Sequence, residues 1–126
     1  MVNLKKYKEY NILYVEDEHM IRNNVEGCLK YIFNVICAKD GEEGLKSFLS
    51  EKIDLVITDL NMPKKNGLTM LKNIRVVSSK TPFIITSAFT PDLLEELKQI
   101  EKCTYLAKPF DIKVLIAKSI SALEIN

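Results

Sequence analysis

Polar residues that could do chemistry follow short apolar runs at four places in this chain. An acid pair follows residues 12–15, a third acid follows 55–58, a hydroxyl follows 83–86 and a lysine follows 105–107; these residues are Glu16, Asp17, Asp59, Ser87 and Lys108. If the runs are neighbouring parallel strands, their ends lie on one edge of a sheet, where open α/β sheets bind ligands. Carboxylates crowded there repel one another unless protonation or a cation relieves them. The arrangement predicts one pocket suited to a divalent metal and a phosphoryl group.

The runs that carry these residues have the features of buried strands. Apolar, β-branched stretches alternate with stretches of helical period, a pattern typical of repeated βα units and of a parallel sheet covered on both faces. We expect five strands, at about residues 11–15, 35–38, 54–58, 83–86 and 104–107.

Each strand is followed by a segment with a helical apolar stripe. Asp40 and the sequence Thr90-Pro91-Asp92 are typical helix starts, because a capping oxygen, an early proline and an early acid suit the N-terminal turn. The positions expected to face the sheet, helix by helix, are Ile21, Val25, Leu29 and Ile32; Leu45, Phe48 and Leu49; Leu68, Leu71 and Ile74; Leu93, Leu94, Leu97 and Ile100; and Ile112, Leu115, Ile116, Ile120 and Leu123.

The composition suits a single globular domain. The chain has 126 residues, of which 47% are hydrophobic and 28% charged, and its net charge is +1 with lysines dispersed among acids. That balance does not indicate nucleic acid as a partner. The apolar runs are of strand length, so neither membrane insertion nor export is indicated, and we expect a cytoplasmic location. The three cysteines lack C-x-x-C spacing, which argues against a disulfide framework or a zinc site.

The order of motifs along the chain resembles a known family. The acid pair, the sequence D-x-N-M-P-x-x-x-G that starts at Asp59, Thr-Ser-Ala at 86–88 and Lys-Pro-Phe at 108–110 look like the receiver domain of two-component response regulators, the CheY-like family, over nearly the whole chain. The resemblance implies a flavodoxin-like α/β fold: a doubly wound (βα)5 sandwich whose five-stranded parallel sheet has the order 2-1-3-4-5, with helices on both faces. We expect a polar N-terminal extension at residues 1–10 and a single receiver domain at 11–126, without an output domain.

The resemblance also implies roles for the acids and the lysine. Asp59 would accept the phosphoryl group, and a carboxylate is a competent nucleophile for such a step. Mg²⁺ would offset the approach of one anion to another, with Asp17 as a direct ligand beside Asp59 and the backbone carbonyl of Asn61, and with Glu16 in contact through water. Lys108 would pair with the phosphoryl oxygens as a point charge.

Ser87 and Tyr105 match the family's switch positions, and Lys108-Pro109 matches the family's lysine-proline pair. The Ser87 hydroxyl would donate a hydrogen bond to a phosphoryl oxygen, and Tyr105 would move inward when that hydroxyl is drawn to the phosphate. The bond between Lys108 and Pro109 is expected to be cis and to aim the lysine into the pocket.

Other residues define the surroundings of the phosphate. Ala88 is small and leaves space beside the pocket. Phe89 and Asn61 match positions that tune dephosphorylation in the family, and Phe89 could shield an acyl phosphate from water. His19 follows the acid pair, but a lone histidine at a helix start is more often a polar surface residue, so we leave it out of the site.

These features predict a stand-alone signalling switch rather than an enzyme with a separate substrate. It would take a phosphoryl group from a histidine kinase or a histidine phosphotransfer protein and assist its own phosphorylation and dephosphorylation. It would then bind a target through the face of the fourth helix, fifth strand and last helix. Alternatives within the family are a phosphorelay intermediate and the receiver fragment of a larger regulator.

Two other classes of protein fit the sequence less well. A phosphatase of the haloacid dehalogenase type also uses an Asp after a strand and Mg²⁺. That class requires a second acid two residues after the Asp, where this chain has Asn61. A dinucleotide-binding module would carry G-x-G-x-x-G after the first strand, and that sequence does not occur there.

Overall fold

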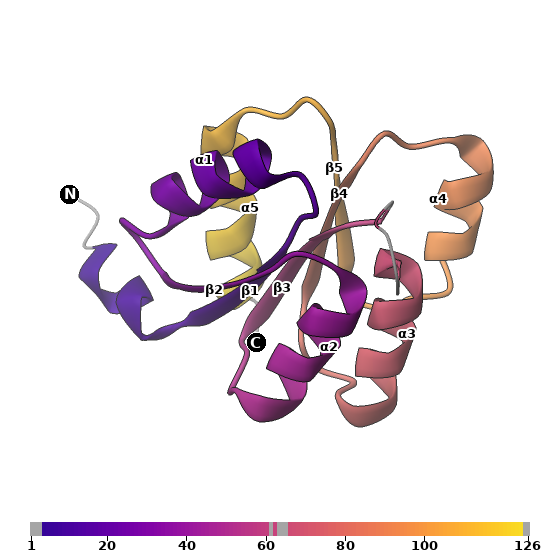
Figure 1. Ribbon diagram of the computed structural model, residues 1–126, viewed down its shortest axis with the longest axis horizontal. Helices are drawn as coiled ribbons and strands as arrows, with labels where there is room; N and C mark the ends of the chain where they lie inside the picture. Colours follow the sequence, from indigo (N-terminus) through magenta and orange to yellow (C-terminus); the bar gives the residue numbers. More distant parts are fainter. Residues whose placement is uncertain (1–3, 61, 63–65, 125–126) are drawn as a thin grey trace.

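Five parallel strands form one sheet at the centre of the computed structural model, which describes residues 4–60, 62 and 66–124 (Figure 1). The strands are β1 (Asn11–Val15), β2 (Asn34–Ala38), β3 (Leu55–Asp59), β4 (Phe83–Ser87) and β5 (Cys103–Ala107). Their order is β2-β1-β3-β4-β5, and every neighbouring pair is parallel. The expected flavodoxin-like order is confirmed, so the carboxyl ends of all the strands lie at one edge.

Helices cover both faces of this sheet. They are α1 (His19–Leu29), α2 (Gly41–Ser50), α3 (Gly67–Val77), α4 (Pro91–Leu97) and α5 (Ile112–Glu124). α1 and α5 pack on one face, while α2, α3 and α4 pack on the other (Figure 1). This arrangement follows from the topology, because the connections between parallel strands carry helices across one face or the other.

Alternate residues of each strand contribute to two separate cores. On β1, Leu13 and Val15 belong to the core beneath α2 and α3, whereas Ile12 and Tyr14 belong to the core beneath α1 and α5. All four side chains are fully buried. A slip of one residue in strand register would exchange the two sets, so burial on both faces fixes where each strand ends.

Side-chain caps start three of the helices close behind the strand ends. Asp40, Asn66 and Thr90 each accept a hydrogen bond from the backbone amide three residues later, at 2.8, 2.8 and 3.2 Å respectively. The helix starts expected at Asp40 and Thr90 are confirmed. Such caps satisfy amides that have no partner within the helix, and they keep the loops between strand and helix short.

A few expected core positions lie elsewhere. Leu49 is 62% exposed and Leu94 is 36% exposed, so both assignments were wrong. Each directly follows a residue that already packs inward, and one step along an α-helix turns a side chain by about 100°. Ile32 and Ile100 do pack in the cores, but they lie beyond the last residues of α1 and α4. The strand boundaries differ from those expected by at most one residue.

The polar N-terminal segment is not a loose extension. Residues Leu4–Glu9 form a 3-10 helix, η1, in which Tyr7 is buried. The Tyr7 ring packs edge-on against Phe33, and its hydroxyl donates a hydrogen bond to Glu124 Oε1 at 2.9 Å. Tyr7, together with the ion pair between Lys6 and Glu124, therefore joins η1 to the last turn of α5. Lys5, Lys6 and Lys8 surround Tyr7 in the sequence, so the segment reads as polar and its buried position is not evident.

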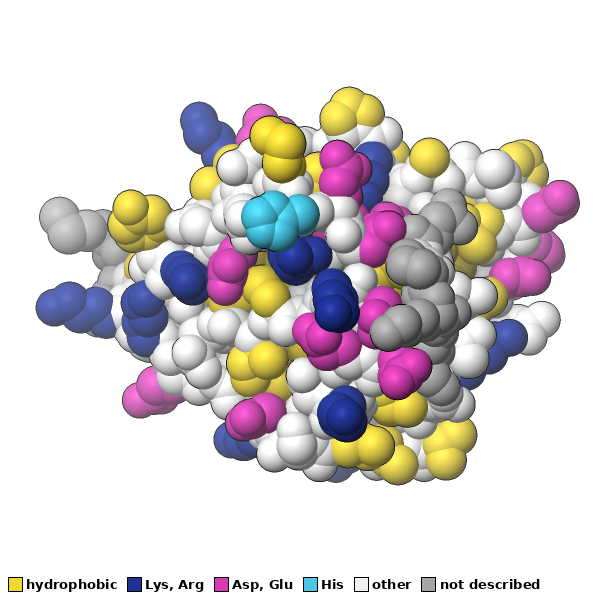
Figure 2. All heavy atoms as spheres, in the orientation of Figure 1, with side chains coloured by type: hydrophobic (Ala, Val, Ile, Leu, Met, Phe, Trp, Pro, Cys, Tyr) yellow, Lys and Arg dark blue, Asp and Glu magenta, His cyan; other side chains and the backbone are white. Residues whose placement is uncertain are grey.

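Charges of both signs are interspersed over the face of the molecule shown in Figure 2, as the small net charge leads one to expect. In the part of the chain that the structure describes, none of the helices combines the length and the apolar character that crossing a membrane requires.

Substitutions at Tyr7 should test whether η1 belongs to the folded domain. Tyr7→Ala removes a buried ring and should lower the urea midpoint of unfolding strongly, while Tyr7→Phe loses only the bond to Glu124 and should lower it slightly. Tyr31→Ala is the matched control, because Tyr31 is 85% exposed. Circular dichroism in urea measures all three. Equal midpoints for Tyr7→Ala and Tyr31→Ala would contradict the packing role.

Candidate functional site

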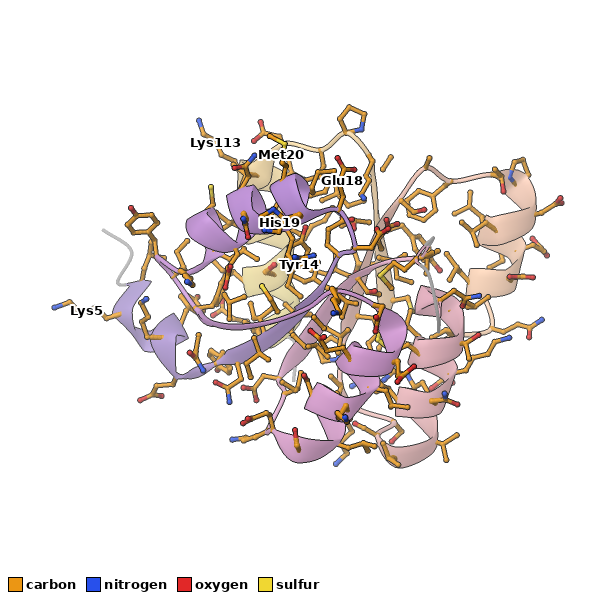
Figure 3. The ribbon with its side chains drawn as sticks, in the orientation of Figure 1. Lys5, Tyr14, Glu18, His19, Met20 and Lys113 are labelled. Carbon is orange, nitrogen blue, oxygen red and sulfur yellow. The ribbon has the colours of Figure 1, made fainter. Side chains whose placement is uncertain are left out.

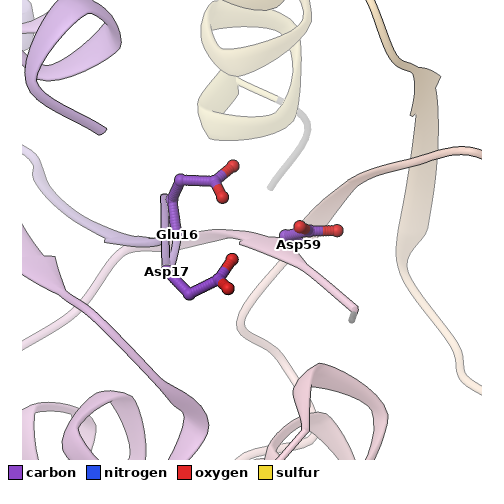
Figure 4. A group of neighbouring side chains, drawn as sticks. All are labelled: Glu16, Asp17 and Asp59. Carbon is purple, nitrogen blue, oxygen red and sulfur yellow. The ribbon is translucent and has the colours of Figure 1, made fainter. Parts of the chain in front are cut away.

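Three carboxylates meet where β1 and β3 end. The two strands are neighbours in the sheet, with Val15 paired to Thr58, so the residues that follow them emerge side by side. Carboxylate oxygens of Glu16, Asp17 and Asp59 all lie within 4.8 Å of one another (Figure 4). Glu16 is 1% exposed and Asp59 is 7% exposed, whereas Asp17 is open to solvent. The sequence-based prediction that these acids form one cluster agrees with this geometry.

Lys108 supplies the opposite charge. It directly follows β5, the strand at one edge of the sheet. Its ammonium Nζ donates hydrogen bonds to Glu16 Oε1 at 2.7 Å and to Asp59 Oδ2 at 3.1 Å. Its backbone amide donates to the Ser87 carbonyl at 2.9 Å, which holds the end of β5 beside the end of β4. The bond between Lys108 and Pro109 is cis, as expected. The Lys108 ammonium lies against the acid cluster, and the lysine side chain remains 24% exposed.

The acids also use backbone amides to hold their orientation. Asp59 Oδ1 accepts a hydrogen bond from the Leu60 amide at 2.7 Å, and Glu16 Oε2 accepts one from the Glu18 amide at 3.2 Å. With the lysine on the other oxygen in each case, both buried carboxylates are held from two sides. Groups fixed in this way are pre-organised for a ligand.

Burial and pairing act against each other on the ionisation of these groups. Burial raises the pKa of Glu16 above its ordinary value, although the hydrogen bonds from Lys108 and from the Glu18 amide oppose that rise. Burial lowers the pKa of Lys108, but its hydrogen bonds to Glu16 and Asp59 outweigh that effect and raise it. Lys108 pairs with Glu16 and Asp59 but not with Asp17, so these three carboxylates and one ammonium carry excess negative charge when all four groups are ionised. Such a cluster attracts a cation.

The predicted hydroxyl and aromatic positions lie at the end of β4 and on β5. Ser87 is 1% exposed, and its Oγ has no hydrogen-bond partner among the described residues. Tyr105 is half-buried, with its hydroxyl 3.4 Å from the Leu97 carbonyl at the end of α4. Phe89 packs edge-on against Tyr105, with ring centroids 5.7 Å apart, and Ala88 is exposed. A buried donor without a partner is costly in a protein and is available to a ligand.

Of two further residues singled out from the sequence, Asn61 and His19, the structure describes only His19. Asn61 lies outside the described residues, so its expected ligand carbonyl stays a prediction. His19 begins α1 beside Glu18 and Met20 (Figure 3), is exposed, and has a ring nitrogen 3.3 Å from the Asn23 amide. It is not among the residues whose ligand atoms gather with Asp59, in agreement with our leaving it out of the site.

Two residues that shape the site did not emerge from the sequence as functional. The Arg22 guanidinium donates to the Glu16 carbonyl at 2.8 Å, from α1 back to the loop before it. Gly67 is buried against the acceptor loop: a Cβ there would lie 2.1 Å from the Asp59 carbonyl oxygen and 2.8 Å from the Leu60 Cα. The glycine in the motif was a signal for this close approach, because only a residue without Cβ fits beside that backbone.

Gly67→Ala should distort the loop that carries Asp59. The added methyl meets backbone atoms that cannot move aside alone, so we expect a loss of about 1–3 kcal/mol in unfolding free energy. Gly27→Ala is the matched control, because a Cβ at Gly27 meets nothing within 4 Å and should be neutral or stabilise α1 by up to about 1 kcal/mol. Chemical unfolding measures both variants. A neutral Gly67→Ala would refute the close approach.

Lys108→Met should raise the pKa of Glu16 further in metal-free buffer, because burial remains while the opposing hydrogen bond is lost. A carboxyl whose folded pKa lies above its unfolded value favours the unfolded state as pH rises between the two. Relative to wild type, the variant should therefore lose stability as pH increases from 4.5, the ordinary Glu value, through the raised pKa.

Carbon-detected NMR of the Glu16 carboxyl over a pH series measures the effect of Lys108→Met directly. Lys113→Met serves as the control, because Lys113 is an exposed lysine on α5 (Figure 3). A Glu16 pKa that stays unchanged or falls in Lys108→Met would show that the ion pair does not control this carboxyl.

Comparison with known proteins agrees with this geometry. Residues 12–119 match the family model for the response regulator receiver domain. Over 115 residues the chain is 36% identical to Response regulator RR06 of Streptococcus pneumoniae, which covers 90% of this chain and 52% of that protein. Over 109 residues it is 38% identical to the transcriptional regulatory protein CpxR of Escherichia coli, which covers 85% of this chain and 46% of that protein. The chain thus spans about half the length of these relatives.

The fold comparison points to the same family. A crystal structure of the Vibrio cholerae chemotaxis protein CheY4 matches with a TM-score of 0.84 at 30% sequence identity, covering 90% of this chain and 98% of that one. The strand order, the acid cluster and the sequence matches agree, and the chain belongs to the response regulator receiver domains of two-component systems.

Proposed function

We propose that this domain is a phosphorylation-controlled switch in which Asp59 accepts a phosphoryl group from a phosphohistidine of a histidine kinase or histidine phosphotransfer protein. The observation that carries the proposal is the pairing of the buried Asp59 with Lys108 at 3.1 Å, inside a cluster of three carboxylates. Lys108 pairs with Glu16 as well as with Asp59, and Asp17 is the third acid of the cluster. One ammonium does not balance three carboxylates, so the cluster suits a divalent cation.

The donor set fits Mg²⁺. This hard ion takes oxygen ligands at about 2.1 Å in an octahedron, so its ligands lie about 3 to 4 Å apart. The carboxylate oxygens of Glu16, Asp17 and Asp59 lie within 4.8 Å of one another, which is close to that range. Asp17 and Asp59 are the proposed direct ligands, with Glu16 bound through water. When bound, Mg²⁺ neutralises charge on the phosphoryl oxygens.

Asp59 is the proposed nucleophile of the transfer. One of its carboxylate oxygens forms a bond to phosphorus while the phosphorus–nitrogen bond of the phosphohistidine breaks. The bonding electron pair goes to the imidazole nitrogen, and the donor histidine, already protonated on its other nitrogen, leaves as neutral imidazole. The result is an aspartyl phosphate. The Lys108 ammonium, which donates to Asp59 Oδ2, is proposed to pair with the phosphoryl oxygens. The Ser87 hydroxyl, which has no hydrogen-bond partner among the described residues, is proposed to donate to one of those oxygens.

The proposed output is a change of surface. A phosphoryl group adds about 1.5 to 2 negative charges, and it can bias a two-state element when one state offers better hydrogen bonds. Movement of Ser87 toward the phosphate frees space beside Tyr105, which contacts Phe89 and the last turn of α4. The face of α4, β5 and α5 is therefore the proposed binding surface for a target protein.

The proposal concerns receiver chemistry, with no turnover of a separate substrate. A phosphorelay intermediate and the receiver part of a longer regulator use the same acceptor, so both stay alternatives within it. Relatives such as CpxR are named as transcriptional regulators and are about twice as long as this chain. The expectation that nucleic acid is not a partner applies to the residues present here, and a cytoplasmic location stays a prediction.

Asp59→Asn should abolish phosphorylation. Wild-type protein incubated with Mg²⁺ and phosphoramidate, a small donor with a phosphorus–nitrogen bond, should gain the mass of one phosphoryl group, and removal of Mg²⁺ with EDTA should prevent this. Asp92→Asn is the control, because Asp92 is an exposed acid at the start of α4. Intact-mass spectrometry measures the adduct. Equal labelling of Asp59→Asn, or no labelling of folded wild type, would overturn the proposal.

A further inference from the structure

Arg22 holds the loop that presents two of the site acids. It lies near the start of α1, and its Nη1 donates a hydrogen bond to the Glu16 carbonyl at 2.8 Å, with the Asp17 carbonyl 3.4 Å away. The two acceptors are consecutive carbonyls of the acid pair itself. The guanidinium therefore bridges the first helical turns back to the end of β1.

Asp17 is the acid that needs such support. Lys108 and a backbone amide hold the carboxylates of Glu16 and Asp59 from two sides. The Asp17 carboxylate accepts no hydrogen bond from any residue that the structure describes, yet its oxygen lies within 4.8 Å of the other two acids. Its direction therefore depends on where its backbone is held and on its own side-chain rotamer.

The start of α1 also lacks the side-chain cap that three of the other helices have. At α2, α3 and α4 the N-cap side chain accepts a hydrogen bond from an amide of the first turn. At α1 the N-cap residue, Glu18, makes no side-chain cap bond, and its own amide donates to Glu16 Oε2 at 3.2 Å. The loop between β1 and α1 is thus held at its carbonyls by Arg22 rather than by a helix cap.

We propose that Arg22 is a positioning residue for the metal and phosphoryl site: it fixes the peptide groups of Glu16 and Asp17, so that the Asp17 carboxylate points toward Glu16 and Asp59. The inference rests on the proposed function, in which Asp17 is a direct ligand of Mg²⁺. Arg22 itself touches neither the metal nor the phosphoryl group.

Charge and geometry make opposite predictions for the loss of Arg22. A cation beside an acid cluster repels Mg²⁺, so removal of the charge alone would tighten Mg²⁺ binding. Loss of a group that orients a ligand weakens binding, typically by about 10-fold or more for residues that hold metal ligands in place. The sign of the change in Mg²⁺ affinity therefore separates a positioning role from a purely electrostatic one.

The test is calorimetric titration of Mg²⁺ alone into wild type, Arg22→Ala and Arg22→Lys. We expect the Kd of Arg22→Ala to rise roughly tenfold. Arg22→Lys keeps the charge with a single donor nitrogen, and its Kd should lie between the other two. The matched control is Arg75→Ala, because Arg75 also donates to two backbone carbonyls, those of Ser78 and Glu101, between α3 and the segment after α4. It should lose stability with no change in Kd.

Each outcome has a defined meaning. A Kd for folded Arg22→Ala equal to or tighter than that of wild type would overturn the positioning role and leave the proposed function standing, as long as wild type binds Mg²⁺ and is phosphorylated. If Arg22→Ala fails to fold, Arg22→Lys decides the question: an unchanged Kd overturns the inference. Wild type that neither binds Mg²⁺ nor accepts a phosphoryl group would defeat the proposed function, and the inference with it.

Discussion

The ion pair that joins Lys108 to Glu16 and Asp59 is the constraint on which the site depends. Both carboxylates are almost fully buried, and a buried charge without a partner costs several kcal/mol. The Lys108 ammonium offsets that cost, with its Nζ at 2.7 Å from Glu16 and 3.1 Å from Asp59. It also ties the ends of β1, β3 and β5 together, although β5 is separated from β1 by two other strands. One side chain thus links the acids to the half of the domain that carries the proposed binding surface.

The topology explains why these groups meet at all. β1 and β3 are adjacent in the sheet although β2 lies between them in the chain, so the strand order reverses beside β1. Open α/β sheets bind ligands in the crevice at such a switch point. Full burial of β3 and β4 leaves no freedom of register. The acids are therefore placed by packing against two cores, before any ligand contributes.

Three features of the same site lower the local stability of the fold. The Ser87 hydroxyl is buried without a hydrogen-bond partner among the described residues, and an unsatisfied buried donor costs about 1–3 kcal/mol in ordinary protein interiors. Gly67 lies against the Asp59 backbone where no other residue fits, and α1 starts without a side-chain cap. Departures of this kind from local rules are typical of functional sites, where a ligand completes what the chain leaves open.

The sequence by itself determined the fold class and the identity of the clustered acids, because apolar runs of strand length fix the strands and each site residue directly follows one of them. It determined less where one long-range contact decides. Tyr7 stands among lysines, yet it is buried against Phe33 and bonded to Glu124 at the other end of the chain. Arg22 reads as an ordinary helix residue, and only the folded loop brings the Glu16 carbonyl to its guanidinium. Period and spacing describe local order, whereas contacts between distant segments depend on how the two cores close around the sheet.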